Sequence, residues 1–156
     1  MEIDLGIIVL KWIHLMATIA WIGGMFTNFF IYIPAMGKTL DPPTTGKLMA
    51  VVMKRFKMVV YISMVLFLLT GMISAAAHFT SDSLTVSSLW NTILAIKIGV
   101  FALMVILAIY AFEFLAPKVS KIASKGPSPE LKGIQKTQML LAMLGFILGM
   151  IMVAIS

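Results

Sequence analysis

Two titratable side chains lie inside otherwise apolar stretches of the sequence, His14 in the first stretch and Lys97 in the third. An imidazole can bind a metal, carry a proton or ligate haem iron. A lysine withdrawn from water can lose its proton, and the neutral amine then carries a lone pair. A charged lysine at the centre of a bilayer costs about 2.5–3.5 kcal/mol on insertion scales. Ionisable residues at membrane depth therefore indicate a functional site.

The neighbours of these two residues recur in steps of three or four, which places them on one face of each helix. With a rise of about 1.5 Å per residue, His14 and Lys97 both lie roughly 10–14 Å inside the outer boundary of the membrane. Thr70, on the second stretch, falls at about the same level. The candidate cofactor-binding residues are His14, Lys97, Trp21, Thr70, Phe67 and Phe101, and the candidate metal ligands are His14, Lys97, Met25 and His78.

Several kinds of chemistry are excluded by the residue types present. The chain has two histidines and no cysteine, so it cannot form the three-histidine site of many catalytic zinc enzymes or any thiolate site. It has no HExxH motif and no glycine-rich phosphate loop, which leaves hydrolytic and nucleotide chemistry without support. The fourteen methionines are mainly flexible apolar filler, although their thioethers also suit cuprous copper.

The elements that must position these residues are membrane helices. The sequence is 61% hydrophobic and only 12% charged, whereas about a quarter of a typical globular chain is charged. A membrane-spanning helix needs about 20 mainly apolar residues, and four stretches qualify. They run over residues 5–33, 58–79, 89–115 and 137–155, with polar loops at 34–57 and 116–136. Because the backbone finds no water in lipid, each span must be helical. The sequence predicts an all-α fold, an integral membrane four-helix antiparallel bundle forming one transmembrane domain over residues 1–156.

The basic residues orient the predicted bundle. Ten of the twelve cations fall in the two loops at 34–57 and 116–136, which lie on the same side of a four-span protein. The other side carries Glu2, Asp4 and Asp82. The positive-inside rule then predicts a plasma-membrane protein with both loops in the cytoplasm and both termini outside. We interpret the net charge of +6 as a result of the membrane topology and as a source of attraction to lipid headgroups, not as a sign of nucleic-acid binding.

Short motifs in the first three spans resemble a known group of membrane proteins. These motifs are Lys11-x-x-His14, Trp21-x-x-Gly24 followed by Met25-Phe26, Met53-Lys54-Arg55-Phe56 leading into Leu69-Thr70-Gly71, and Trp90 seven residues before Lys97. The group joins the CopD copper-resistance membrane domain to the HemJ-type protoporphyrinogen oxidases. The HemJ branch implies b-type haem held by a first-helix histidine and a third-helix lysine, positions that fall on His14 and Lys97. The CopD branch implies copper uptake or resistance.

The chain departs from the HemJ pattern at two places. That family shows an arginine after the Trp-x-x-Gly motif and a histidine late in the third helix. This chain has Thr27-Asn28-Phe29-Phe30 and Ile109-Tyr110 there. The departures put porphyrinogen oxidation in doubt, though not cofactor binding.

Three functions are therefore weighed. The first is a haem b protein that uses His14 and Lys97 as ligands, in electron transfer or as a membrane oxidoreductase acting on porphyrin. The second is a copper-handling protein that uses His14 together with Met25, Met72 and Met104. The third is a non-catalytic membrane subunit. The expected partners are the lipid bilayer and either a redox partner or a second copy of the chain. Haem ranks above copper because an ammonium group is a poor ligand for cuprous copper, whereas a porphyrin offers an iron and two carboxylates.

Overall fold

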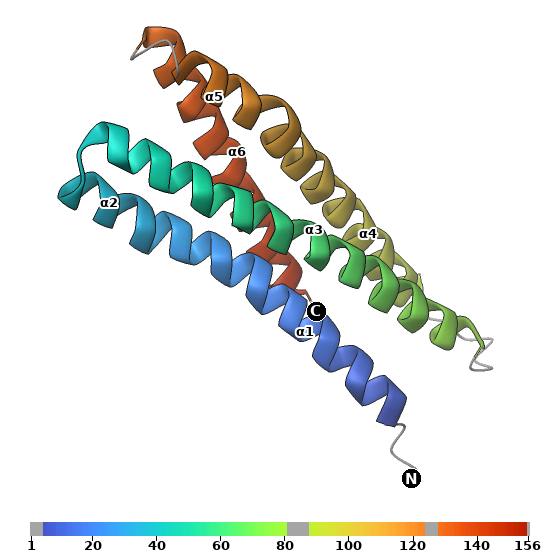
Figure 1. The fold of residues 1–156 in the computed structure, drawn as a ribbon. Coiled ribbons are helices and arrows are strands. Elements are labelled where there is room, and N and C mark those ends of the chain that lie inside the picture. Colours follow the sequence, from blue (N-terminus) through green and yellow to red (C-terminus); the bar gives the residue numbers. More distant parts are fainter. Residues whose placement is uncertain (1–4, 81–87, 124–127, 156) are drawn as a thin grey trace. The chain divides into compact units, whose positions relative to one another are not determined.

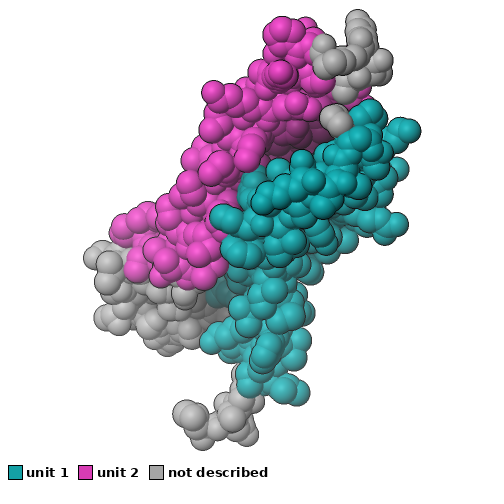
Figure 2. Space-filling model, turned by 90° about the vertical axis from the view of Figure 1, so that its left-hand side faces the viewer, with its two compact units in different colours: residues 1–85 teal, residues 86–156 magenta. Residues whose placement is uncertain are grey.

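The computed structural model describes residues 5–80, 88–123 and 128–155, and all of its regular structure is helical. Four of its helices are long and apolar enough to span a membrane. The predicted all-α fold is confirmed, and the long helices pack in contact pairs, consistent with a four-helix membrane bundle. The chain divides into two compact units, residues 1–85 (unit 1) and 86–156 (unit 2), coloured separately in Figure 2. Each is described by itself, and the single transmembrane domain stays a prediction.

Unit 1 begins with helix α1, Leu5–Thr27. The hydroxyls of its two threonines are satisfied within the helix, as a low-dielectric surrounding requires. The hydroxyl of Thr18 donates to the carbonyl of His14 at 2.9 Å, and that of Thr27 donates to the carbonyl of Gly23 at 2.8 Å. Such bonds to the carbonyl four residues earlier allow threonine to lie inside a membrane helix without an unpaired hydroxyl.

A π-helix, η1 (Asn28–Tyr32), interrupts this helix just before a proline. The N–H of Ile33 donates to the carbonyl of Asn28, five residues back. Pro34 follows with no N–H to give, so in a regular α-helix the carbonyl of Phe30 would lose its donor. The wider turn accommodates the proline, and the chain continues as helix α2, Ile33–Thr39. Pro34, which the sequence suggested as the end of the first helix, therefore lies within a continuous helical rod.

The turn between α2 and the next helix of unit 1 is only two residues long. Leu40 is extended, and Asp41 caps helix α3, Pro42–Thr80, by accepting a hydrogen bond from the N–H of Thr44 at 3.1 Å. Pro42 occupies the first helical position, where its missing N–H costs nothing. Asp41-Pro42 thus begins α3 well before the apolar span that the sequence indicated.

The cap makes the stability of unit 1 depend on pH. The hydrogen bonds from Thr44 lower the pKa of Asp41 below its ordinary value of 3.8. A lowered pKa means that the stabilisation is present above the unfolded-state pKa and is lost as pH falls through the folded-state value. The Asp41→Asn variant keeps the capping oxygen without the charge. Wild type is expected to melt at a higher temperature than this variant at pH 7, with the difference shrinking as pH falls below 3.8 and vanishing once the Asp41 carboxyl is protonated in the folded state. A difference in melting temperature that is constant from pH 7 to 3 would contradict the prediction.

Helices α1 and α3 lie side by side along unit 1 (Figure 1). The helices approach closely at Gly24, where an added Cβ would lie 2.5 Å from the ring of Phe56. Trp21 is 3% exposed and Val60 is 1% exposed. The absence of a side chain at Gly24 therefore allows Phe56 to pack against the backbone of α1.

Unit 2 contains a second pair of helices. Helix α4 (Ser88–Ile109) leads through the π-helix η2 (Tyr110–Leu115) into α5 (Ala116–Ala123), and α6 (Pro129–Ala154) returns along α4. Ser128 caps α6 by accepting a hydrogen bond from the N–H of Leu131 at 3.1 Å. Met104, Leu115 and Gly149 are buried.

The helices extend well beyond the four apolar stretches. Most of the predicted loops at 34–57 and 116–136 is helical, and the described turns are at residues 40–41 and at Ser128. Apolar length measures the thickness of the lipid, whereas a helix continues for as long as its residues favour it and no cap ends it. The basic residues of these segments therefore lie mainly on helix ends rather than on irregular loops.

Candidate functional site

His14 and Thr70 form the polar centre of unit 1. The Nδ1 atom of His14 lies 2.7 Å from Oγ1 of Thr70, which joins the middle of α1 to α3. Thr70 is 3% exposed and His14 is half-buried. This contact agrees with the level that the sequence predicts for Thr70.

The hydrogen bonds of Thr70 define the tautomer of a neutral His14. The Thr70 hydroxyl is also 2.7 Å from the carbonyl of Leu66. A hydroxyl has one hydrogen, and a carbonyl oxygen can only accept. Both short contacts contain a hydrogen when the imidazole donates from Nδ1 to Thr70 and Thr70 donates to Leu66. The lone pair of the imidazole is then on Nε2, the arrangement found for metal-bound histidines whose other nitrogen donates to a protein oxygen.

An aromatic side chain completes this cluster. The ring of Phe67 meets the imidazole of His14 edge-on, with centroids 4.8 Å apart at 63°, and lies 5.9 Å from the ring of Trp21. Trp21 is nearly fully buried. The structure therefore brings together four of the six residues predicted to bind a cofactor, and we name His14, Trp21, Phe67 and Thr70 the histidine cluster. Their role in binding a cofactor stays a prediction.

The predicted metal ligands of unit 1 do not form one coordination sphere. Met25 is buried on α1, eleven residues after His14, which corresponds to about 16 Å along the axis. His78 lies on α3, but its side chain is outside the described residues. Among the described residues, no group of three or more His, Asp or Glu side chains could hold a metal ion. Met25 and His14 can share a path for copper, but not one ion.

Lys97 and Phe101 belong to unit 2. Both lie on α4 and both are half-buried, one helical turn apart on the same face. Their association with the histidine cluster stays a prediction.

Asn28 is a buried polar residue to which the sequence assigned no role. It begins the π-helix η1, is 5% exposed, and its Oδ1 atom has no hydrogen-bond partner among the described residues. A carboxamide oxygen buried without a donor costs about 1–3 kcal/mol. The signal in the sequence was an asparagine inside an apolar span, six residues before a proline. The π-helix at this place adds to the interest of Asn28, because π-helices often occur at functional sites.

The cost of the unpaired oxygen makes a prediction for Asn28→Leu. Leucine has the same branched arrangement of four side-chain heavy atoms as asparagine and removes the unsatisfied group, so the variant is expected to be more stable by about 1 kcal/mol. Thermal unfolding of the purified protein in detergent measures the change. Lower stability in Asn28→Leu would instead mean that Oδ1 has a hydrogen-bond donor in the folded protein.

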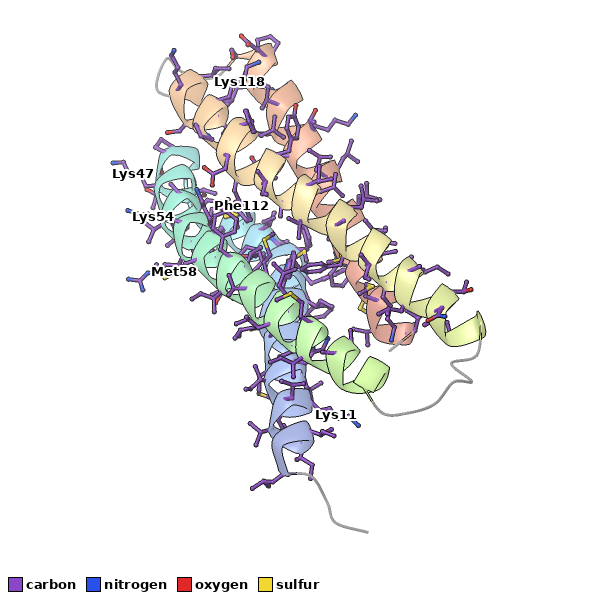
Figure 3. All side chains as sticks on the ribbon, turned by 90° about the vertical axis from the view of Figure 1, so that its right-hand side faces the viewer. Lys11, Lys47, Lys54, Met58, Phe112 and Lys118 are labelled. Atoms are coloured by element: carbon purple, nitrogen blue, oxygen red, sulfur yellow. The ribbon has the colours of Figure 1, made fainter. Side chains whose placement is uncertain are left out.

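Charged side chains are distributed unevenly along unit 1. Lys47 and Lys54 lie near the start of α3, and Lys11 lies towards the opposite end of the unit (Figure 3). The Nζ atom of Lys57 lies 5.5 Å from the centre of the Tyr61 ring, a distance typical of a cation–π contact. Lys38 is in the last turn of α2, beside the same turn of the chain. Apart from Lys11, the basic residues of unit 1 thus lie in the half of the unit that contains the turn between α2 and α3.

Comparison with known proteins identifies a family. Residues 16–128 match the model of a domain of unknown function, DUF4149. The match includes Trp21, Phe67, Thr70 and Lys97 and begins two residues after His14. The comparisons with curated proteins and with solved structures found no match. Because the matched segment covers more than half of the chain, this four-span membrane protein belongs to the DUF4149 family.

Proposed function

We propose that this protein binds b-type haem in the membrane, with His14 as an axial ligand and electron transfer or porphyrin oxidation as its role. The observation that carries the proposal is the hydrogen bond between His14 Nδ1 and the Thr70 hydroxyl, which the hydroxyl relays to the carbonyl of Leu66. It orients the imidazole and leaves the ligating lone pair on Nε2.

The donor set of the histidine cluster fits such a group. Haem iron in proteins is commonly bound by a histidine nitrogen. Phe67 lies against the imidazole and the buried Trp21 lies against Phe67, so apolar aromatic side chains line this side of the ligand and keep water away. When bound, haem would supply one-electron chemistry, while the protein orients the ligand and adjusts its potential through the hydrogen bond at Nδ1.

Lys97 remains our candidate for the second ligand, on the basis of the membrane depth that the sequence predicts for it. It lies within an apolar helix, where an ammonium group needs a compensating interaction. An amine nitrogen can bind iron, and an ammonium can instead pair with a propionate. The resemblance to HemJ-type proteins assigns the same two positions, whereas the departures at Thr27–Phe30 and Ile109–Tyr110 weigh against porphyrinogen as the substrate. We also propose, from the positive-inside rule, that the basic ends of the helices face the cytoplasm.

Copper handling is a second candidate because thioethers are buried in unit 1. Met25, Met36 and Met64 are each 6–7% exposed, and soft sulfur ligands select cuprous copper. Since Met25 is far along α1 from His14, these residues would serve successive sites rather than a single one.

An optical spectrum tests the proposal. Protein purified from haem-replete cells is expected to show a Soret band that is lost in His14→Ala. The matched control is Leu15→Ala, which removes an exposed side chain next to His14 on the same helix. A wild-type protein that stays colourless after haemin is added contradicts the haem proposal. Stoichiometric copper in that colourless protein, lost in His14→Ala, would favour the second candidate, and binding of neither would favour a non-catalytic subunit.

A further inference from the structure

The two units have the same order of elements. Each has a long helix, a π-helix, a short helix and a second long helix. The second long helix returns along the first in each unit (Figure 1). In unit 1 these are α1, η1, α2 and α3, and in unit 2 they are α4, η2, α5 and α6. π-Helices make up well under 1% of residues in ordinary proteins. One at the same place in each unit is therefore a specific point of likeness.

The likeness extends to the residues that end each π-helix. The N–H of Ile33 donates to the carbonyl of Asn28, and the N–H of Ala116 donates to the carbonyl of Ala111. A proline follows each of these donors, at positions 34 and 117, which are 83 residues apart. The same combination of an i−5 hydrogen bond and a proline thus occurs once in each unit.

The start of the returning helix is also the same in both units. Asp41 and Ser128 are both capping residues followed by a proline at the first helical position. In each case the capping side chain accepts from the N–H three residues on, and the capping carbonyl accepts from the N–H four residues on. Asp41 and Ser128 are 87 residues apart rather than 83, so the correspondence in number changes before Ser128.

The pattern of burial agrees with the alignment of the two prolines. Trp21 is 3% exposed, and Met104, 83 residues later, is 5% exposed. Every buried or half-buried residue between positions 14 and 36 has a buried or half-buried counterpart 83 residues later, except Gly23 and Thr27. Conversely, every buried or half-buried position between residues 97 and 119 has a buried or half-buried counterpart 83 residues earlier, except Leu115. The two first helices therefore turn the same positions inward, on both sides of the π-helix.

We infer that the chain is a tandem repeat of one helical hairpin and that Lys97 occupies in the second hairpin the position of His14 in the first. Both residues precede the proline of their unit by 20 positions. Because each hairpin crosses the membrane twice, both start on the same side and form a parallel repeat. Equivalent residues of a parallel repeat lie at equal depth. The family match, residues 16–128, covers most of the first hairpin and the α4–η2–α5 part of the second, and ends at Ser128 before α6.

The repeat explains how the chain could supply two ligands to a haem. This part of the inference rests on the proposed haem function. Iron in a porphyrin has two axial positions, one on each face. A repeated hairpin supplies two equivalent inward positions at one depth, and here the first holds an imidazole and the second an amine. The difference between the two side chains is then a divergence of the repeats at one position, with the surrounding inward face retained.

Spin labelling of the full-length chain tests the repeat without any cofactor. The native chain has no cysteine, so single cysteines can be introduced at matched exposed positions and labelled. The pairs are Leu15 with Ile98, Phe26 with Ile109, and Ile31 with Phe114, each 83 residues apart and each exposed. Immersion depth in lipid vesicles follows from relaxation by oxygen and by a water-soluble nickel complex.

The members of each pair are expected at depths that agree within about 2 Å, whereas Leu15 and Phe26 differ along their helix by about 16 Å. Depths that differ within two of the three pairs by more than one helical turn, about 5.4 Å, overturn the repeat. This outcome is independent of the haem proposal. Matched depths in a protein that never binds haemin support the repeat and overturn the haem function, and a Soret band with unmatched depths does the opposite.

Discussion

Gly24→Ala is expected to destabilise unit 1 by about 1–3 kcal/mol, the usual cost of forcing an extra group into a packed contact. The new Cβ would lie 2.5 Å from Cε2 and 3.2 Å from Cδ2 of Phe56, distances that require the ring or the helix to move. Phe56 is half-buried between α1 and α3, which restricts that movement. Thermal unfolding in detergent, followed by tryptophan fluorescence, measures the loss.

Gly23→Ala is the matched control for this prediction. A Cβ at Gly23 would meet nothing within 4 Å, so the change should be neutral or stabilising by up to about 1 kcal/mol through higher helix propensity. Phe56→Leu should recover part of the stability lost in Gly24→Ala, since it removes the ring that the new Cβ meets. Equal melting temperatures for the two alanine variants would show that α1 and α3 do not approach closely at Gly24.

Thr70→Val is expected to have the second large effect, because it leaves the Nδ1–H of His14 without its acceptor. Valine has nearly the shape of threonine, so the loss of about 1–3 kcal/mol reports the unpaired polar group rather than a cavity. On the haem proposal the same variant should bind haemin about 10–100-fold more weakly, the usual effect of removing the outer hydrogen bond of a ligating histidine.

Thr70→Ser separates the hydroxyl from the methyl group. Serine retains the acceptor for His14 and the donor for the carbonyl of Leu66, so haemin affinity should stay within a few-fold of wild type. If valine and serine at position 70 bind haemin equally well, the hydroxyl does not orient the ligand, and the relay from His14 through Thr70 to Leu66 has no part in cofactor binding.

Much of the fold could be predicted because it depends on average composition. Four apolar stretches of sufficient length predict four helices, and period-3.6 spacing predicts which residues share a face of each helix. Spacing and equal depth together are enough to place His14, Trp21, Phe67 and Thr70 in one candidate site. These inferences need only the rise and the repeat of a helix, which are the same in every protein.

The features that could not be predicted depend on local hydrogen bonding and on single contacts. Pro34 reads as a helix end when hydrogen bonds four residues apart are assumed, and the π-helix before it changes that count. The helical ends beyond the apolar stretches carry no hydropathy signal. The contact of Gly24 with Phe56 joins residues whose separation in the sequence has no pattern, and Gly23 beside it has no such neighbour.

The π-helices η1 and η2 have a consequence for how the length of this chain can change. A π-turn holds about one residue more than an α-turn, so removing one residue from Asn28–Tyr32 or Tyr110–Leu115 keeps nearly the same relative orientation of the two ends of the helix. Replacing Pro34 or Pro117 in the same chain then restores the α-helical hydrogen bond that a proline cannot donate. Elsewhere in a membrane helix, deleting a residue rotates everything beyond it by about 100° and turns an inward face towards lipid. The two π-helices are therefore the places where related chains can gain or lose single residues. The faces of α1 and α4 that carry His14 and Lys97 then keep their orientation relative to the basic ends of the same helices.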